Sequence, residues 1–165
     1  MKDSLEIERK FLIKYPDIKK ISLINGLEVA EMEQSYLKDG GRIRKIIKGE
    51  ETSYIKTVKK HITNIKREEK EWEISGEEYF KALKYKAQGT DTIVKTRYAL
   101  PLFGFVYEID VFPFWNDRAF MEVELESENQ QFPIPEFVEI IKEVTEDKRY
   151  TNSSLSREII TEDIL

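Results

Sequence analysis

The sequence contains no cysteine and a single histidine, and these two absences exclude several kinds of active site. Without cysteine, the chain can form no disulfide, no thiolate nucleophile and no cysteine-ligated zinc site. The one histidine, His61, rules out a multi-histidine metal site within one chain. It lies close to Asn64 in an expected hairpin turn, where a surface role is the simpler interpretation. The chemistry must therefore come from carboxylates, Lys, Arg, Tyr, Ser or Thr.

The chain also lacks a surplus of basic residues, since its formal net charge is −5. A protein that binds nucleic acid non-specifically usually has such a surplus, so we expect no nucleic-acid partner. The first residues lack the apolar region of a signal peptide, and no stretch approaches the roughly 18 apolar residues of a membrane span. We therefore expect a cytoplasmic protein with no membrane partner. A length of 165 residues suits one domain, which we place at 1–165.

Charge is plentiful, at 36% of residues, and most of the chain alternates with a period of two. That period is typical of β-strands whose two faces differ. The expected strands are 5–14, 28–37, 42–48, 52–59, 66–75, 92–100, 104–112 and 119–127. So many strands with little helix indicate an α+β, mainly β fold. We expect an eight-stranded antiparallel β-barrel with a few helices packed outside.

Helical spacing of apolar residues appears in a few short segments. Ser75 is a plausible N-cap with Glu78 three residues later, which is the pattern of a capping box. A proline near the start of another segment suits the first turn of a helix. The expected helices are 17–24, 75–86 and 135–144, with one more turn or short helix at 155–160.

Nearly every expected strand carries charges at positions i and i+2, and each set is mostly of one sign. These sets are Glu6, Glu8 and Lys10; Arg42 and Arg44; Glu69, Glu71 and Glu73; Lys95 and Arg97; Glu108 and Asp110; and Glu122, Glu124 and Glu126. In a barrel, alternate residues point inward. A charged outer face around an apolar interior is the ordinary arrangement of soluble barrels, and it remains an alternative to a charged lumen.

A charged lumen would repel itself unless it held a ligand. Clustered Lys and Arg favour a polyanion, whereas clustered Glu and Asp favour hard cations such as Mg²⁺ or Mn²⁺. A polyphosphate carrying a divalent metal meets both needs. An acidic protein can bind such a polyanion through local basic groups.

The same residues resemble a known family. Segment 6–10 matches the ExExK signature of the CYTH, or triphosphate tunnel metalloenzyme, superfamily. Matching blocks follow at 41–44, 57–59, 71–74, 94–98, 108–112, 122–125 and 144–150, in the family's order. The chain is most similar to short bacterial members that consist of a CYTH domain alone. The resemblance implies an eight-stranded antiparallel tunnel with charged walls, a triphosphate-containing substrate, and Mg²⁺ or Mn²⁺ as cofactor.

The resemblance also implies roles for individual residues. Phosphate oxygens would be bound by Lys10, Arg42, Arg44, Lys59, Lys95 and Arg97. Metal would be held by Glu6, Glu8, Glu122 and Glu124, and the rest of an acidic wall would come from Glu71, Glu73, Glu108 and Asp110. Glu6, Glu8, Lys10 and Lys95 would be the catalytic set. Lys148 and Arg149 would reach one tunnel mouth, with a solvated loop as the alternative. Tyr36 lies on a wall strand, where a hydrogen bond in the lumen and ordinary packing are equally open.

The expected reaction is hydrolysis of inorganic triphosphate to diphosphate and phosphate, which needs positioning and charge neutralisation more than a covalent nucleophile. The resemblance also permits a nucleoside triphosphatase, a thiamine triphosphatase or an adenylyl cyclase. A non-catalytic polyphosphate- or nucleotide-binding module is a further alternative. A homodimer is compatible with the sequence.

Overall fold

The computed structural model describes residues 2–63 and 65–164. They form nine strands: β1 (Lys2–Lys14), β2 (Glu28–Tyr36), β3 (Arg42–Lys48), β4 (Glu51–His61), β5 (Lys66–Ile74), β6 (Ile93–Leu102), β7 (Phe105–Val111), β8 (Arg118–Glu124) and β9 (Ile140–Glu143). The expected strands are all present, but β4 continues through His61, so this residue lies on a strand and not in the turn. Asn64 lies outside the described residues.

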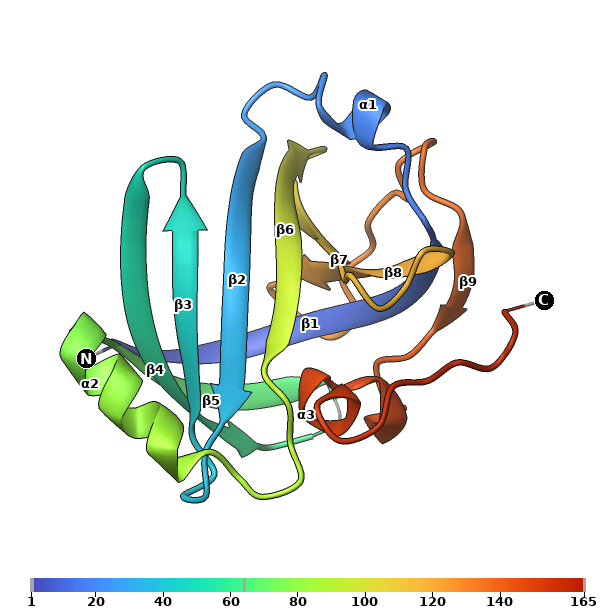
Figure 1. Ribbon diagram of the computed structural model, residues 1–165. Coiled ribbons are helices and arrows are strands. Elements are labelled where there is room, and N and C mark those ends of the chain that lie inside the picture. Colours follow the sequence, from blue (N-terminus) through green and yellow to red (C-terminus); the bar gives the residue numbers. More distant parts are fainter. Residues whose placement is uncertain (1, 64, 165) are drawn as a thin grey trace.

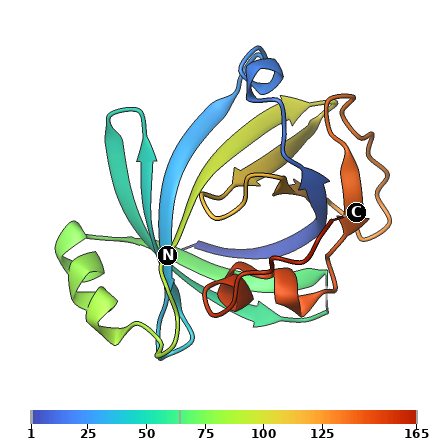
Figure 2. The same cartoon turned by 45° about the vertical axis from the view of Figure 1, so that its right-hand side comes forward.

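Eight of the strands close into a barrel, because β1 pairs with both ends of the remaining sheet. The order runs β5-β4-β3-β2-β6-β7-β8-β1, and β1 also pairs with β5. All pairings are antiparallel, with Glu6 of β1 opposite Arg67 of β5 and Lys10 opposite Glu122 of β8. Figures 1 and 2 show the strands wrapped around a common axis. The predicted eight-stranded antiparallel barrel is confirmed, with one extra strand.

The extra strand, β9, replaces the helix predicted for 135–144, and that prediction was wrong. Its residues pair with the second half of β1, with Phe11 opposite Glu143 and Ile13 opposite Ile140. On this edge β1 pairs with β5 only up to Ile7. Without β9, the backbone of the second half of β1 would have no hydrogen-bond partners on that edge. Backbone pairing of two β-branched isoleucines, Ile140 and Ile141, therefore outweighs the helical spacing.

The helices are short. They are α1 (Ile18–Ile21), α2 (Gly76–Ala82) with the 3₁₀ turn η1 (Leu83–Tyr85), and η2 (Lys148–Tyr150) followed by α3 (Asn152–Leu155). Ser75 caps α2 as expected, because its Oγ accepts a hydrogen bond of 3.0 Å from Glu78 N. The turn or short helix expected at 155–160 begins earlier, since α3 spans Asn152–Leu155 and only a turn follows it at Ser156 and Arg157. No helix in the described part of the chain is long and apolar enough to cross a membrane.

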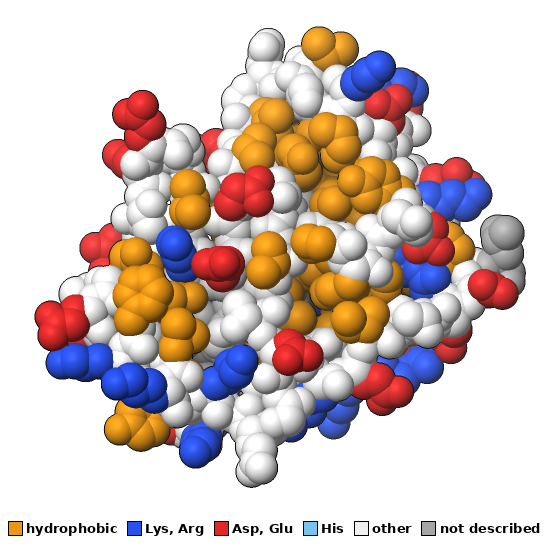
Figure 3. All heavy atoms as spheres, in the orientation of Figure 1, with side chains coloured by type: hydrophobic (Ala, Val, Ile, Leu, Met, Phe, Trp, Pro, Cys, Tyr) orange, Lys and Arg blue, Asp and Glu red, His pale blue; other side chains and the backbone are white. Residues whose placement is uncertain are grey.

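The apolar side of most strands faces outward and is covered by other elements. Around β1, β7 and β8 the buried outer residues include Phe11, Ile109 and Met121. Elsewhere α2 packs Tyr79 against Ile43 of β3. The cover is incomplete, and exposed apolar side chains gather over the outside of the sheet around β6 (Figure 3). The apolar residues of these strands face outward, so the charged residues that alternate with them face the barrel interior. The structure therefore has a charged lumen and not a charged outer face around an apolar interior.

One end of the barrel interior is apolar. Inward residues of three strands, Leu12, Ile93 and Phe120, form a buried cluster with Phe112, which directly follows β7, and with Trp115, Val144, Tyr150 and Leu155. Tyr150 and Leu155 come from η2 and α3, which both ribbon views place against the lower part of the barrel. The C-terminal segment thus packs into this end, and the charged side chains occupy the remaining interior.

Candidate active site in the barrel lumen

The charged residues of the barrel surround a cavity of about 490 Å³. Its lining includes most of the residues predicted from the sequence, namely Glu6, Glu8, Lys10, Arg42, Arg44, Lys59, Glu71, Lys95, Arg97, Glu108, Glu122 and Glu124. They come from seven of the eight barrel strands, and Tyr36 of β2 lines the cavity as well. Strand alternation is what brings them together, because residues at i and i+2 share the inner face.

The basic part of the wall is made by β3, β4 and β6. Arg44 Nη2 lies 3.8 Å from Glu71 Oε1, and Lys59 Nζ lies 3.5 Å from Glu6 Oε2. Burial lowers the pKa of Lys59 and lowers that of Arg44 to about 9, with a further contribution from neighbouring Arg42 in each case. The Nε atoms of Arg42 and Arg44 are buried without a hydrogen-bond partner among the described residues. The carboxylates present therefore do not neutralise these cations fully.

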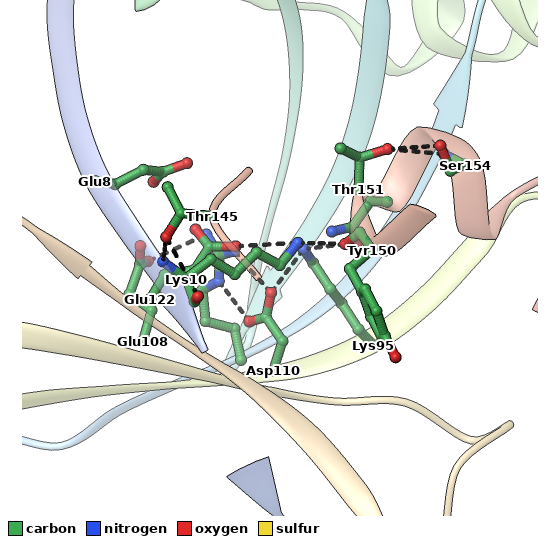
Figure 4. Close-up of polar contacts among 12 residues, drawn as sticks. Glu8, Lys10, Lys95, Glu108, Asp110, Glu122, Thr145, Tyr150, Thr151 and Ser154 are labelled. Atoms are coloured by element: carbon green, nitrogen blue, oxygen red, sulfur yellow. Dashed lines mark hydrogen bonds and ion pairs between the residues drawn. The ribbon is translucent and has the colours of Figure 1, made fainter. Parts of the chain in front are cut away.

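Lys95, Arg97 and Asp110 form a buried cluster at the junction of β6 and β7. Figure 4 shows the side chain of Lys95 directed toward Asp110. Arg97 donates to both carboxylate oxygens of Asp110, at 2.7 and 2.9 Å, and Lys95 Nζ donates to Oδ2 at 2.9 Å. Burial opposes ionisation of Asp110, but Arg97 and Lys95 hold its pKa well below the usual range. Burial lowers the pKa of Lys95 to about 7. Asp110 thus stands behind the two cations and fixes their positions.

Lys10 lies near the boundary between the charged and apolar interior. Its Nζ donates to the backbone oxygen of Tyr150 at 2.8 Å, lies 3.7 Å from Glu122 Oε1, and sits 4.0 Å from the centroid of the Phe120 ring. Burial lowers its pKa. The cation–π contact and the carbonyl hold the ammonium in the cavity wall.

The acidic part of the wall lies on β1, β5, β7 and β8. Register places Glu124 opposite Glu8 and places Glu122 beside both Lys10 and Glu108. Glu8 forms an ion pair with Arg67. Burial raises the pKa of Glu6, helped by a hydrogen bond with Glu69, and burial also raises the pKa of Glu108. Lys59 lies 3.5 Å from Glu6 and Arg97 lies 3.1 Å from Glu108, but the cost of burial exceeds the attraction of these cations.

A divalent metal fits the donor set of this wall. Glu6, Glu8, Glu122 and Glu124 all line the cavity, and Glu6 Oε2 is buried without a hydrogen-bond partner in the described part of the chain. Within residues 2–63 and 65–164, no three carboxylate or histidine side chains converge closely enough to hold an ion by themselves. Mg²⁺ usually takes one or two carboxylates and completes its shell with waters and substrate phosphates, so this arrangement suits a metal that arrives with a phosphate ligand.

Some predicted site residues lie elsewhere. Glu73 is exposed near the end of β5 and does not line the cavity. Lys148 and Arg149 are also absent from the lining. Arg149 pairs with Asp147 at 2.9 Å and with Glu162 at 3.8 Å on the outside. The structure therefore does not bring this pair to the lumen.

Several lining residues were missed. Arg67 shares the inward parity of Glu71 on β5, so alternation alone could have identified it, and Glu69, named in the alternation, was given no role in the site. Thr145, Thr151, Asn152 and Ser153 come from segments after the last barrel strand, and no periodic signal identifies them. His61, assigned to the surface, is exposed but lines the cavity as well.

The fold and site define a class of protein: a closed antiparallel barrel whose lumen has a cationic and an acidic wall. A family model for the CYTH domain matches residues 4–158, and the chain belongs to this family. The chain is similar to the crystal structure of the inorganic triphosphatase NE1496, with 32% sequence identity over 94% of this chain and 97% of that chain and a TM-score of 0.59. It is also similar to a conserved hypothetical protein from Pyrococcus furiosus, Pfu-838710-001, with 28% identity over 75% of this chain and 80% of that chain and a TM-score of 0.54. No curated protein matches the sequence significantly.

Proposed function

We propose that this protein hydrolyses a linear triphosphate, most readily inorganic triphosphate, with Mg²⁺ or Mn²⁺ as cofactor. The observation that carries the proposal is one cavity in which burial disfavours the charged forms of both the cations and the carboxylates. The pKa values of Arg44, Lys59 and Lys95 are lowered on one part of the wall, and those of Glu6 and Glu108 are raised on another. A metal-bearing polyphosphate would bring negative charge to the cations and positive charge to the carboxylates at the same time, and so would stabilise both charged forms.

In this proposal the basic side chains position the phosphate chain. Arg42 and Arg44 bind phosphate oxygens through pairs of parallel N–H groups. Arg97, whose parallel N–H pair is held by Asp110, acts on the phosphate as a point charge, as the lysines do. Glu6, Glu8, Glu122 and Glu124 would hold the metal, which would supply positive charge to the transferred phosphoryl group. Similarity to an inorganic triphosphatase at 32% identity supports this assignment.

The chemical step needs only water as nucleophile. The water oxygen attacks the terminal phosphorus in line with the bridging oxygen, the P–O bond to that oxygen breaks, and diphosphate leaves. Glu108 is suited to accept the proton released by the water, because it lines the cavity and burial raises its pKa, which makes its carboxylate a stronger base.

The cavity lining favours a substrate without an organic group. Among its described residues, Tyr36 and His61 are the aromatic ones, and the rest are almost all charged or hydroxyl-bearing. A nucleobase or a thiazolium ring usually packs on aromatic or apolar surface. Inorganic triphosphate needs no such surface.

A substrate panel tests the proposal. Purified protein is incubated with inorganic triphosphate, ATP or thiamine triphosphate, each with Mg²⁺, Mn²⁺ or chelator, and the products are identified. Inorganic triphosphate should give the highest kcat/KM, and chelator should stop the reaction. Faster turnover of ATP or thiamine triphosphate, or formation of cyclic AMP, would favour the other activities. Tight binding without turnover would favour a binding module.

A further inference from the structure

The segment from Tyr150 to Asn152 contacts two of the lysines in the cavity wall. The backbone oxygen of Tyr150 accepts from Lys10 Nζ at 2.8 Å, and Asn152 Oδ1 accepts from Lys95 Nζ at 3.3 Å. Figure 4 shows both ammonium groups directed toward this segment. The segment follows the last strand and lies outside the charge pattern of the barrel. Asn152 therefore has no counterpart in the alternation that explains the other site residues.

Packing and capping hold the segment in place. Tyr150 and Leu155 are 1% and 2% exposed and pack with Phe112 and Phe120. Thr151 caps α3, with its Oγ1 accepting from Ser154 N at 3.1 Å, and Ser154 Oγ donates to Lys148 O at 2.6 Å. Asn152 is thus fixed at the first position of α3, and its side chain has a defined place beside Lys95.

Lys95 itself is 2% exposed, and its surroundings leave one of its N–H groups for a ligand. An ammonium has three donors. One goes to Asp110 on β7 at 2.9 Å, and a second goes to Asn152 on α3. The other charged groups that act on it are Arg97 on β6 and Glu122 on β8. Because Lys95 lines the cavity, the third donor is the one available to a phosphate oxygen there.

We propose that Asn152 is a positioning residue, which holds the ammonium of Lys95 in the orientation that binds a phosphate oxygen of the substrate. The proposal rests on the proposed function, because it assigns a part in triphosphate binding to a residue outside the barrel strands. Asp110 accepts one hydrogen bond from Lys95 beside the two from Arg97, and a single hydrogen bond does not fix the direction of all three N–H groups of an ammonium. Asn152 supplies a second, separate acceptor. A neutral acceptor stabilises the charged ammonium without competing with phosphate through a negative charge.

Two substitutions at position 152 give effects of opposite sign. Asn152→Ala removes the acceptor and should raise KM for inorganic triphosphate about tenfold with a smaller change in kcat. The rise of KM at alkaline pH should also begin at a lower pH in this variant. The ammonium of Lys95 loses a stabilising partner there, so its pKa falls further. Asn152→Asp places a carboxylate at the same distance and should shift the rise of KM to higher pH. Asn129→Ala, in an exposed turn after β8, is the matched control and should change neither quantity.

A second measurement does not depend on turnover. An NMR titration of the lysine Cε resonances, with Lys95 assigned through its absence in Lys95→Met, should give a lower pKa for Lys95 in Asn152→Ala and a higher one in Asn152→Asp. If both variants retain the wild-type titration and the wild-type KM profile, the positioning role is overturned. If the wild-type protein hydrolyses no triphosphate, the proposed function fails separately. Calorimetry with inorganic triphosphate then replaces KM, and equal affinity of the wild-type protein and Asn152→Ala would overturn the inference.

Discussion

The ammonium of Lys95 lies 2.9 Å from Asp110 Oδ2, and the two side chains are only 2% and 1% exposed. The pair joins neighbouring strands β6 and β7 and is extended by Arg97, which holds both oxygens of the same carboxylate. Asp110 is therefore the fixed anion around which two cations of the cavity wall are arranged. Replacing one partner of such a buried pair leaves the other as an uncompensated buried charge, which strongly lowers the free energy of unfolding.

Replacing Asp110 by Asn should destabilise the fold by about 3–5 kcal/mol, because Lys95 and Arg97 are left buried without their anion. Urea unfolding followed by circular dichroism measures the change. Glu77→Gln is the control, since Glu77 forms an exposed i,i+4 pair with Lys81 on α2 at 3.1 Å. That variant should lose less than about 0.5 kcal/mol. Equal losses in the two variants would contradict the structural role given to Asp110.

Glu6→Gln should separate stability from function. Burial and the hydrogen bond with Glu69 raise the pKa of Glu6 in the folded chain. A carboxyl whose folded pKa is raised contributes stability in acid that is lost as the pH rises through that pKa. At pH 7 without metal, the variant should therefore be at least as stable as wild type, and this advantage should vanish below pH 4.

The same variant loses one of the proposed metal ligands, so its kcat/KM should fall by about 100-fold. Thermal unfolding in metal-free buffer and phosphate release with excess Mg²⁺ give the two readouts. A variant that is strongly destabilised at pH 7 and yet fully active would contradict both expectations.

Arg44→Lys should keep the charge of the cationic wall and lose the paired N–H geometry. We expect KM for inorganic triphosphate to rise about tenfold, with the folded state preserved. Arg157→Lys is the matched control, because Arg157 is exposed and donates to the Gln88 backbone outside the lumen. If Arg44→Lys binds triphosphate as well as wild type does, Arg44 is a point charge and not a bidentate ligand.

Leu155→Ala should weaken the packing of the C-terminal segment into the barrel. Leu155 is 2% exposed within the cluster that contains Phe120 and Tyr150, so the substitution should cost about 2–4 kcal/mol. Because the same segment holds Lys10 and Lys95, the affinity for triphosphate should fall even at a temperature where the variant is fully folded. Urea titration and calorimetry at low temperature measure these effects. Unchanged affinity would show that the two lysines are positioned without this segment.

Alternation predicted most of the barrel and most of the cavity wall. A residue such as Arg44 or Glu122 is placed in the lumen by the period of a strand, which the sequence displays directly. The alternation does not decide whether the charged face points into the barrel. That depends on which face of the sheet the helices and loops cover. The resemblance to the CYTH family favoured the lumen, and the outward-facing core confirms it.

The parts that escaped prediction depend on long-range contacts. Segment 140–143 has helical spacing, but it becomes β9 because β1 offers an unpaired edge, and no local signal reports that edge. Asn152 reaches Lys95 only because Tyr150 and Leu155 pack into one end of the barrel. Arg149 was expected at the cavity mouth, but its neighbour Asp147 and the distant Glu162 hold it outside.

The central claim is that the lumen hydrolyses inorganic triphosphate with the help of a divalent metal held by its carboxylates. The most direct test follows the reaction of inorganic triphosphate by ³¹P NMR with wild-type protein and with Glu122→Gln, each with Mg²⁺, Mn²⁺ or chelator. The wild-type protein should form one diphosphate and one phosphate per triphosphate only when metal is present, and the variant should be slower by about 100-fold. Failure of the folded wild-type protein to turn over triphosphate with either metal would contradict the account, as would equal rates for the variant.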